Sequence, residues 1–205
     1  NVTSGTFRID PLNSFENTPS GSVLAFGSGQ INIGGAQTDV FISDGTLEVN
    51  GGKIQFQPST LVNKAPTTIS GVVETISAGH MTWVNITIPV STTFEIGSNT
   101  DITIDGAFNN DGSINMNTFN PVQFFFEPGS TWTGNGEIRM LGGNIAEIRN
   151  NDPSTPLIHP ATHTITSSVT TGHLMINTGD MINLGLINVT SGTFRIDPLN
   201  SFENT

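Results

Sequence analysis

Short runs in which apolar and polar residues alternate recur along the whole chain, and many of them begin with glycine. The shared pattern is glycine, any residue, apolar, any residue, apolar. Because successive side chains of a strand point to opposite faces, each run predicts a short strand with one face toward a core. The glycine gives the backbone the freedom for a sharp corner before the strand. The runs lie at residues 5–9, 29–33, 45–49, 52–56, 79–83, 112–116, 136–140 and 185–189.

Some of these runs follow one another after only a few residues, as at 45–56, 106–116 and 185–196. A strand, a corner and a second strand is the pattern of one coil of a parallel β-helix, in which each coil stacks on the one before. Since crossovers between parallel strands are almost always right-handed, we predict an all-β, right-handed parallel β-helix (β-solenoid). Asn50-Gly51 and Asp111-Gly112 also suit hairpin turns, so tandem antiparallel β-sandwiches are the alternative fold.

A long repeat contains these short runs. Residues 1–18 and 188–205 are identical, so that Asn1 recurs as Asn188 and Thr18 as Thr205. This predicts that 1–187 is one period of a tandem β-solenoid repeat and that 188–205 begins the next period. Neighbouring units of the same protein, stacked end to end, are then the expected partners. Both copies of the segment are expected to pack the same faces, with their Phe and Ile side chains inward.

Proline-rich stretches interrupt the pattern. Residues 150–160 contain three prolines and are predicted to form a loop that protrudes from the column, and residues 13–21 and 58–66 are interpreted as two more loops. The run Phe124 to Phe126 cannot point inward throughout if it forms a strand, so at least one ring is expected at the surface, at a corner or over a loop.

Composition narrows the class further. With 23 glycines, little leucine or alanine and frequent Asn, Ser and Thr, the chain has few stretches in which a helix could form. A net charge of −11 repels nucleic acid and anionic lipid, so no nucleic-acid partner is expected. No cysteine is present, and no apolar run approaches the roughly 20 residues of a membrane helix, so no membrane span is expected in this segment.

The stretches 44–50 (DGTLEVN) and 107–116 (AFNNDGSINM) carry a resemblance. They are similar to the β-helical repeats of large secreted bacterial surface proteins, which include autotransporter-like adhesins and fibre-forming giant repeat proteins. The resemblance implies an elongated extracellular or cell-surface filament. It implies no catalytic residue, because no active-site motif of a family is matched.

The expected function is therefore structural: an extracellular repeat unit of a surface fibre, stalk or filament. The alternative is an adhesin module that binds glycans, the cell surface or a partner protein through loops such as 150–160. A polysaccharide lyase or hydrolase is the third hypothesis. Asp101 and Asp105 share a strand face, and with Asp111 they could form a carboxylate pair or a Ca²⁺ site. We interpret them as turn and surface residues, and expect no enzyme, catalytic residue or cofactor.

Histidines and glycosylation triplets are the remaining candidate residues. His159 and His163 are four apart, a metal-ligand spacing on a helix, but Pro160 disfavours a helix and we expect no metal. His80 and His173 follow glycines at polar strand positions and are expected to face solvent. Possible N-glycosylation sites head the Asn-x-Thr triplets at Asn1, Asn85 and Asn188.

Overall fold

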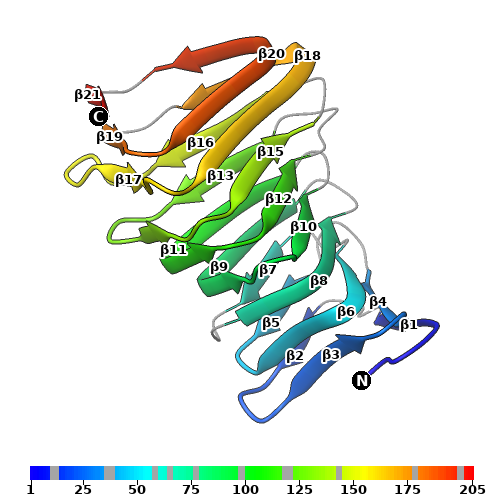
Figure 1. Ribbon diagram of the computed structural model, residues 1–205. Coiled ribbons are helices and arrows are strands. Elements are labelled where there is room, and N and C mark those ends of the chain that lie inside the picture. Colours follow the sequence, from blue (N-terminus) through cyan, green and yellow to red (C-terminus); the bar gives the residue numbers. More distant parts are fainter. Residues whose placement is uncertain are drawn as a thin grey trace.

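The chain forms a single column of stacked coils in the computed structural model (Figure 1). The structure describes residues 1–9, 14–34, 40–56, 60–63, 67–75, 79–96, 100–116, 122–141, 145–176, 180–197 and 201–205. These residues contain strands, turns and bends and no helix. The two termini lie at opposite ends of the column, so the chain runs from one end of the stack to the other.

Each coil contributes strands to three faces, here named A, B and C in the order in which the chain visits them. Face C is an uninterrupted parallel ladder of nine strand segments. It consists of β2 (Ser14–Asn17), β5 (Val40–Ser43), β7 (Thr60–Asn63), the first halves of β9 (Gly79–Ile88) and β11 (Thr100–Asn110), β13 (Val122–Phe126), β16 (Ala146–Asn150), and the second halves of β18 (Thr164–Ile176) and β20 (Leu186–Ile196).

The other two faces are built in the same way. Face B contains β1 (Thr6–Ile9), β4 (Gln30–Ile33), the second halves of β6 (Thr46–Phe56) and β8 (Thr67–Thr75), β10 (Thr93–Ile96), β12 (Ser113–Met116), β15 (Glu137–Met140), and the first halves of β18 and β20. Face A contains β3 (Ser22–Phe26), the remaining halves of β6, β8, β9 and β11, then β14 (Thr131–Thr133), β17 (Leu157–His159), β19 (Asp180–Asn183) and β21 (Ser201–Asn204).

The strand registers confirm the parallel β-helix and exclude the antiparallel sandwiches for the described strands. All ladder pairs between them are parallel, from the partners closest in sequence, such as Lys53 and Val72, to the farthest, such as Ala146 and Leu174. Partners are thus always one coil apart. Asn50-Gly51 and Asp111-Gly112 lie at corners between faces A and B rather than in hairpin turns.

The interior of the column is one continuous apolar core. In β13 the inward Phe124 and Phe126 are fully buried, whereas Phe125 points outward and its ring lies 5.5 Å from the Arg149 guanidinium carbon. The prediction that one ring of this run leaves the core is confirmed. Trp132 packs on Phe108, its ladder partner in the preceding coil, with ring centroids 5.8 Å apart, so aromatic rings also pack along the column axis.

Close approach of neighbouring coils, rather than unusual φ angles, explains most of the corner glycines. Gly29, Gly52, Gly112 and Gly136 precede face B strands without a positive φ. A Cβ added to Gly136 would lie 2.3 Å from the carbonyl oxygen of Gly112, and one added to Gly29 would lie 2.1 Å from that of Val2. Glycine is thus required at these corners because the backbones of stacked corners come too close for a Cβ atom. From the sequence, glycine was expected there for its backbone freedom instead.

Each of the three predicted loops contains part of a strand, which the sequence did not predict. Within 13–21 and 58–66, the segments Ser14–Asn17 and Thr60–Asn63 are rungs of face C. Within 150–160, Asn150 ends β16 and Leu157–His159 is a rung of face A, so the irregular residues are 151–156 and Pro160. A corner of a coil accommodates proline and Asx residues, and this is why these signals mark corners here rather than protruding loops.

Candidate functional site: the open ends and a polar chain that reaches one of them

The N-terminal end of the column is an open apolar hollow of about 410 Å³. Phe7, Ile9 and Phe15 line it, together with Val23 and Ile31 from the next coil. Phe7 is 54% exposed although it occupies an apolar position of its strand, and among the described residues β1 has a ladder partner on one side, β4. The end of the core is therefore accessible to another apolar surface.

The C-terminal end carries a matching hollow of about 430 Å³. Its apolar lining includes Phe194, Ile196 and Phe202 with Leu186 and Ile187. Leu186 is 58% and Ile196 37% exposed. An open strand edge with exposed apolar side chains is a surface on which a further strand can pack.

The two hollows are lined by the same three residues of the duplicated segment. Phe7, Ile9 and Phe15 of the first copy correspond to Phe194, Ile196 and Phe202 of the second. Both copies form strands at equivalent positions, Thr6–Ile9 matching the end of β20 and Ser14–Asn17 matching Ser201–Asn204. The corner glycine has a positive φ in both, +72° at Gly5 and +85° at Gly192. The two copies thus form strands over 6–9 and 193–196 and over 14–17 and 201–204, and they differ in which side is covered.

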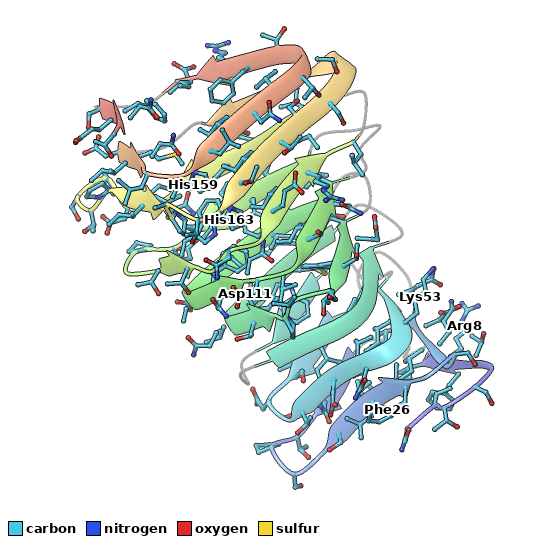
Figure 2. The ribbon with its side chains drawn as sticks, in the orientation of Figure 1. Arg8, Phe26, Lys53, Asp111, His159 and His163 are labelled. Carbon is cyan, nitrogen blue, oxygen red and sulfur yellow. The ribbon has the colours of Figure 1, made fainter. Side chains whose placement is uncertain are left out.

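A chain of polar side chains runs through the core toward the C-terminal end. Figure 2 shows Asp111, His163 and His159 along one edge of the stack. His159 and His163 are both buried against Trp132, whose ring lies 4.9 and 4.8 Å from their imidazoles. The two imidazoles contact each other, with His159 Nε2 3.1 Å from His163 Nδ1. The prediction of a loop is wrong for His159, which ends β17, whereas His163 lies in the corner that follows this strand.

The hydrogen bonds of this chain fix its direction. The Oδ1 atom of Asn110 accepts from the Gly112 N–H, so its Nδ2 donates to His163 Nε2 at 2.9 Å. His163 then carries its proton on Nδ1 and donates to His159 Nε2, and His159 Nδ1–H donates to Asn183 Oδ1. Asn183 Nδ2 donates in turn to Asn204 Oδ1 at 2.6 Å. Each side chain of this chain keeps its hydrogen-bond partners only while both imidazoles are neutral.

Burial keeps these histidines neutral. Desolvation and, to a smaller extent, the neighbouring His159 lower the pKa of His163 to about 3, with Asp111 opposing the shift. Desolvation also lowers the pKa of His159, against the hydrogen bond with Asn183, which raises it. A buried imidazole in this setting is a structural group whose protonation would place a donor against a donor. Sequence reasoning missed this chain, although Leu157 and His159 share the inward side of one strand.

An outward groove of about 410 Å³ lies on face C, lined by His80, Thr82, Thr103, Asp105, Phe125, Glu127 and Asn151. Asp101 is not part of it: four residues of extended strand separate Asp101 from Asp105 by about 13 Å, too far for a glycosidase carboxylate pair. Glu127, which the sequence did not suggest, is the carboxylate that lines the groove with Asp105, and it accepts from Asn151 Nδ2 at 2.8 Å.

The remaining residues of interest lie on the surface or at corners. Asp111 caps a corner, accepting from the Asn135 N–H at 2.9 Å, as expected of a turn residue. His80 is exposed, as predicted, while the side chain of His173 lies outside the described residues. Asn1, Asn85 and Asn188 are all exposed, and Asn85 Oδ1 accepts from the Ala107 N–H.

The described residues contain no group of three or more His, Cys, Asp or Glu side chains placed to hold a metal ion. Among the same residues, no helix has the length and apolarity needed to cross a membrane. Comparison with protein-family models, with curated proteins and with solved structures gives no match for this chain. The parallel strand pairings show that the chain has the fold of a parallel β-solenoid.

Proposed function

We propose that the chain is a structural unit of an extracellular fibre in which β-solenoid units, each equivalent to residues 1–187, follow one another head to tail. The observation that carries the proposal is that one identical segment lines the open apolar hollow at both ends of the column. A hollow that is closed by the next copy of the same segment needs no separate cap, and the exposed strand edges become internal rungs.

Charge and composition are consistent with such an elongated surface protein. The 1–187 unit carries 5 basic and 15 acidic residues once Arg195, Asp197 and Glu203 of the second copy are removed, so each added unit contributes −10. Like charges along a fibre favour solubility and disfavour side-by-side association. The resemblance of the stretches 44–50 and 107–116 to repeats of secreted bacterial surface proteins is the basis for proposing an extracellular or cell-surface location, which antibody labelling of intact cells would test.

Length is the property that tests the proposal. Proteins of one, two and three consecutive units should be rods, by electron microscopy or small-angle scattering, that lengthen by about 40 Å per unit, because about eight coils stack at ~4.8 Å. A string of beads joined at variable angles, or dimensions that do not grow along one axis, would overturn the proposal.

Glycan binding is a second candidate, and the face C groove favours it over the 150–160 stretch. The groove places the outward Phe125 ring beside Asp105 and Asn151, and aromatic rings with carboxylate and amide groups are the usual surface for sugars. Binding on a glycan array that Phe125→Ala abolishes and Phe7→Ala leaves intact would support this function. Absence of binding to neutral and acidic glycans would reject it.

A further inference from the structure

We infer that successive units of the fibre are rotated by one face of the coil, so that each unit presents its surfaces a third of a turn away from those of its neighbour. The inference rests on the proposed function and adds the geometry of the junction to it. It follows from where the two copies of the duplicated segment lie. Because both copies are present, the structure shows the segment once with its downstream neighbour and once with its upstream neighbour.

Three separate pairings give the same shift. Val2 bridges to Ala25 on face A, whereas its counterpart Val189 pairs with Ser167 on face B. Thr6–Ile9 pairs with Gln30–Ile33 on face B, whereas residues 193–196 pair with residues 173–176 on face C.

The third pairing closes the cycle. Ser14–Asn17 pairs with Val40–Ser43 on face C, and Ser201–Asn204 pairs with Asp180–Asn183 on face A. Each strand of the second copy therefore lies one face further along the coil than the same strand of the first copy, in the same direction.

The ladder on face C gives the number of coils in a unit. Eight successive pairings lead from β2 to the end of β20, and β21, the counterpart of β2, lies one face beyond that rung. A unit thus advances eight coils and one third. Three units complete 25 coils and bring the same face back to the same side.

The polar chain supports the rotated junction. Its last member, Asn204, corresponds to Asn17 of the first copy, and Asn17 forms hydrogen bonds with the coil above it. Asn204 accepts through Oδ1 from Asn183 below it. In the first copy, Asn17 donates through Nδ2 to Ser43 Oγ at 3.1 Å and to the Thr46 carbonyl at 3.0 Å, both in the coil above. The two sets use different atoms of one amide, so they can coexist in a single junction residue.

Continuity of direction is the second point in favour. The bonds from Asn110 to His163, from His159 to Asn183 and from Asn183 to Asn204 each donate to a coil nearer the C-terminal end, and the bonds of Asn17 to Ser43 and Thr46 do the same, while His163 donates to His159 within one coil. With a rotation of one face, Asn204, which ends the last face A strand of one unit, is at the same time the residue that corresponds to Asn17 in the first face C strand of the next unit. Without the rotation, the buried chain would end at the junction and Asn183 would lose its acceptor.

The rotation would distribute each surface of the unit around the axis of the fibre. Any surface of the unit, such as the face C groove or the exposed Asn85, would face three directions in turn instead of forming one stripe. A partner with several binding sites could therefore engage the fibre from any side, and one that must contact two neighbouring units along a single line could not. The negative charge of each unit is likewise distributed around the axis.

Cryo-electron microscopy of a protein with three consecutive units tests this inference directly. Superposing equivalent Cα atoms of neighbouring units should give a rotation of about 120° with a rise of about 40 Å along a common axis. Units that share a common axis without any rotation between them would overturn the one-third shift while leaving the solenoid fibre intact. Units without a common axis would instead overturn the proposed function.

Cysteine cross-linking gives an independent readout in the same protein, which has no cysteine of its own. The rotated register pairs Ile182 with Glu203, so Ile182→Cys with Glu203→Cys should form a disulfide across adjacent parallel strands. Without rotation Glu203 would lie on face C, and the matched pair Met175→Cys with Glu203→Cys should react instead. The ratio of the two yields decides between the registers, and preferential reaction of the Met175 pair would overturn the inference.

Discussion

The middle of the column and its two ends contain the same alternation of apolar and polar residues, yet only the middle buries it. In the middle, Phe108, Phe124 and Phe126 are at most 1% exposed, and their rings contact one another at 5.5–5.8 Å. At the ends, Phe7 is 54% and Ile196 37% exposed on strands of the same kind. The difference shows that the rungs on both sides of a strand bury its apolar side chains. A strand with one neighbouring rung therefore gains only part of the stabilisation that burial gives.

Core truncation should show this contrast most strongly. Phe124→Ala removes a ring packed on Phe108 and Phe126 and should lower the free energy of unfolding by about 3–5 kcal/mol. Phe7→Ala in the 205-residue chain should cost less than about 1 kcal/mol, because the ring is half exposed. Urea unfolding measures both.

A junction between two units allows the same ring to be compared with and without a covering coil. In a two-unit protein, Phe194→Ala should approach the cost of Phe124→Ala, because the next coil would cover that ring. A Phe194→Ala cost that does not change when the second unit is added would show that the hollow stays open.

Acid should weaken the half of the column that contains the buried histidines. Both have a lowered pKa in the folded chain, that of His163 to about 3, so below pH 6.5 the unfolded chain binds protons that the folded chain does not. Stability should therefore be complete above pH 6.5 and fall toward pH 3 by up to about 1.4 kcal/mol per pH unit for His163, and His159 adds to the loss in the same direction.

Urea midpoints between pH 7.5 and 4.5 measure this dependence, and the exposed His80 supplies the control. His80→Gln should leave the slope unchanged, whereas His159→Gln with His163→Gln should flatten it. If that double variant does not fold, imidazole resonances of the native chain give the answer. Titration of either buried histidine near pH 6.5 would contradict the proposed chain of neutral imidazoles.

Corner glycines should have a smaller effect that depends on stacking. Gly136→Ala would bring a Cβ within 2.3 Å of the Gly112 carbonyl oxygen and should cost about 1–3 kcal/mol. Gly129→Ala is the matched control: nothing lies within 4 Å of its Cβ position, and its φ of +82° alone should cost about 1 kcal/mol. Equal costs would mean that backbone conformation, not close approach, selects glycine at these corners.

The sequence predicted much of the fold because alternation with period two is a local property. Strands were expected at the glycine runs, and Phe125 behaves as the outward member of its run. The rungs Ser14–Asn17, Thr60–Asn63 and Leu157–His159 were missed, since they are short and lie between prolines. Their strand conformation depends on a neighbouring coil whose register a single sequence does not reveal.

The candidate sites were harder to predict, for the same reason. The contacts of His163 with Asn110 and of Asp105 with the groove join residues from different coils, at separations set by the length of each coil. The duplication and the inward side of its strands were visible in the sequence. The face of the column on which each copy lies was not, because the copies occupy successive faces and the period is not a whole number of coils.

Hydrogen exchange of the duplicated segment tests most directly whether a neighbouring unit completes each end. In a protein of two consecutive units, this segment occurs at the first end and at the junction, and a third copy is present if residues 1–18 are repeated after the second unit. The account predicts that amides of the junction copy are protected as strongly as those of β13, while the terminal copies exchange quickly. Equal, fast exchange in all copies would contradict it.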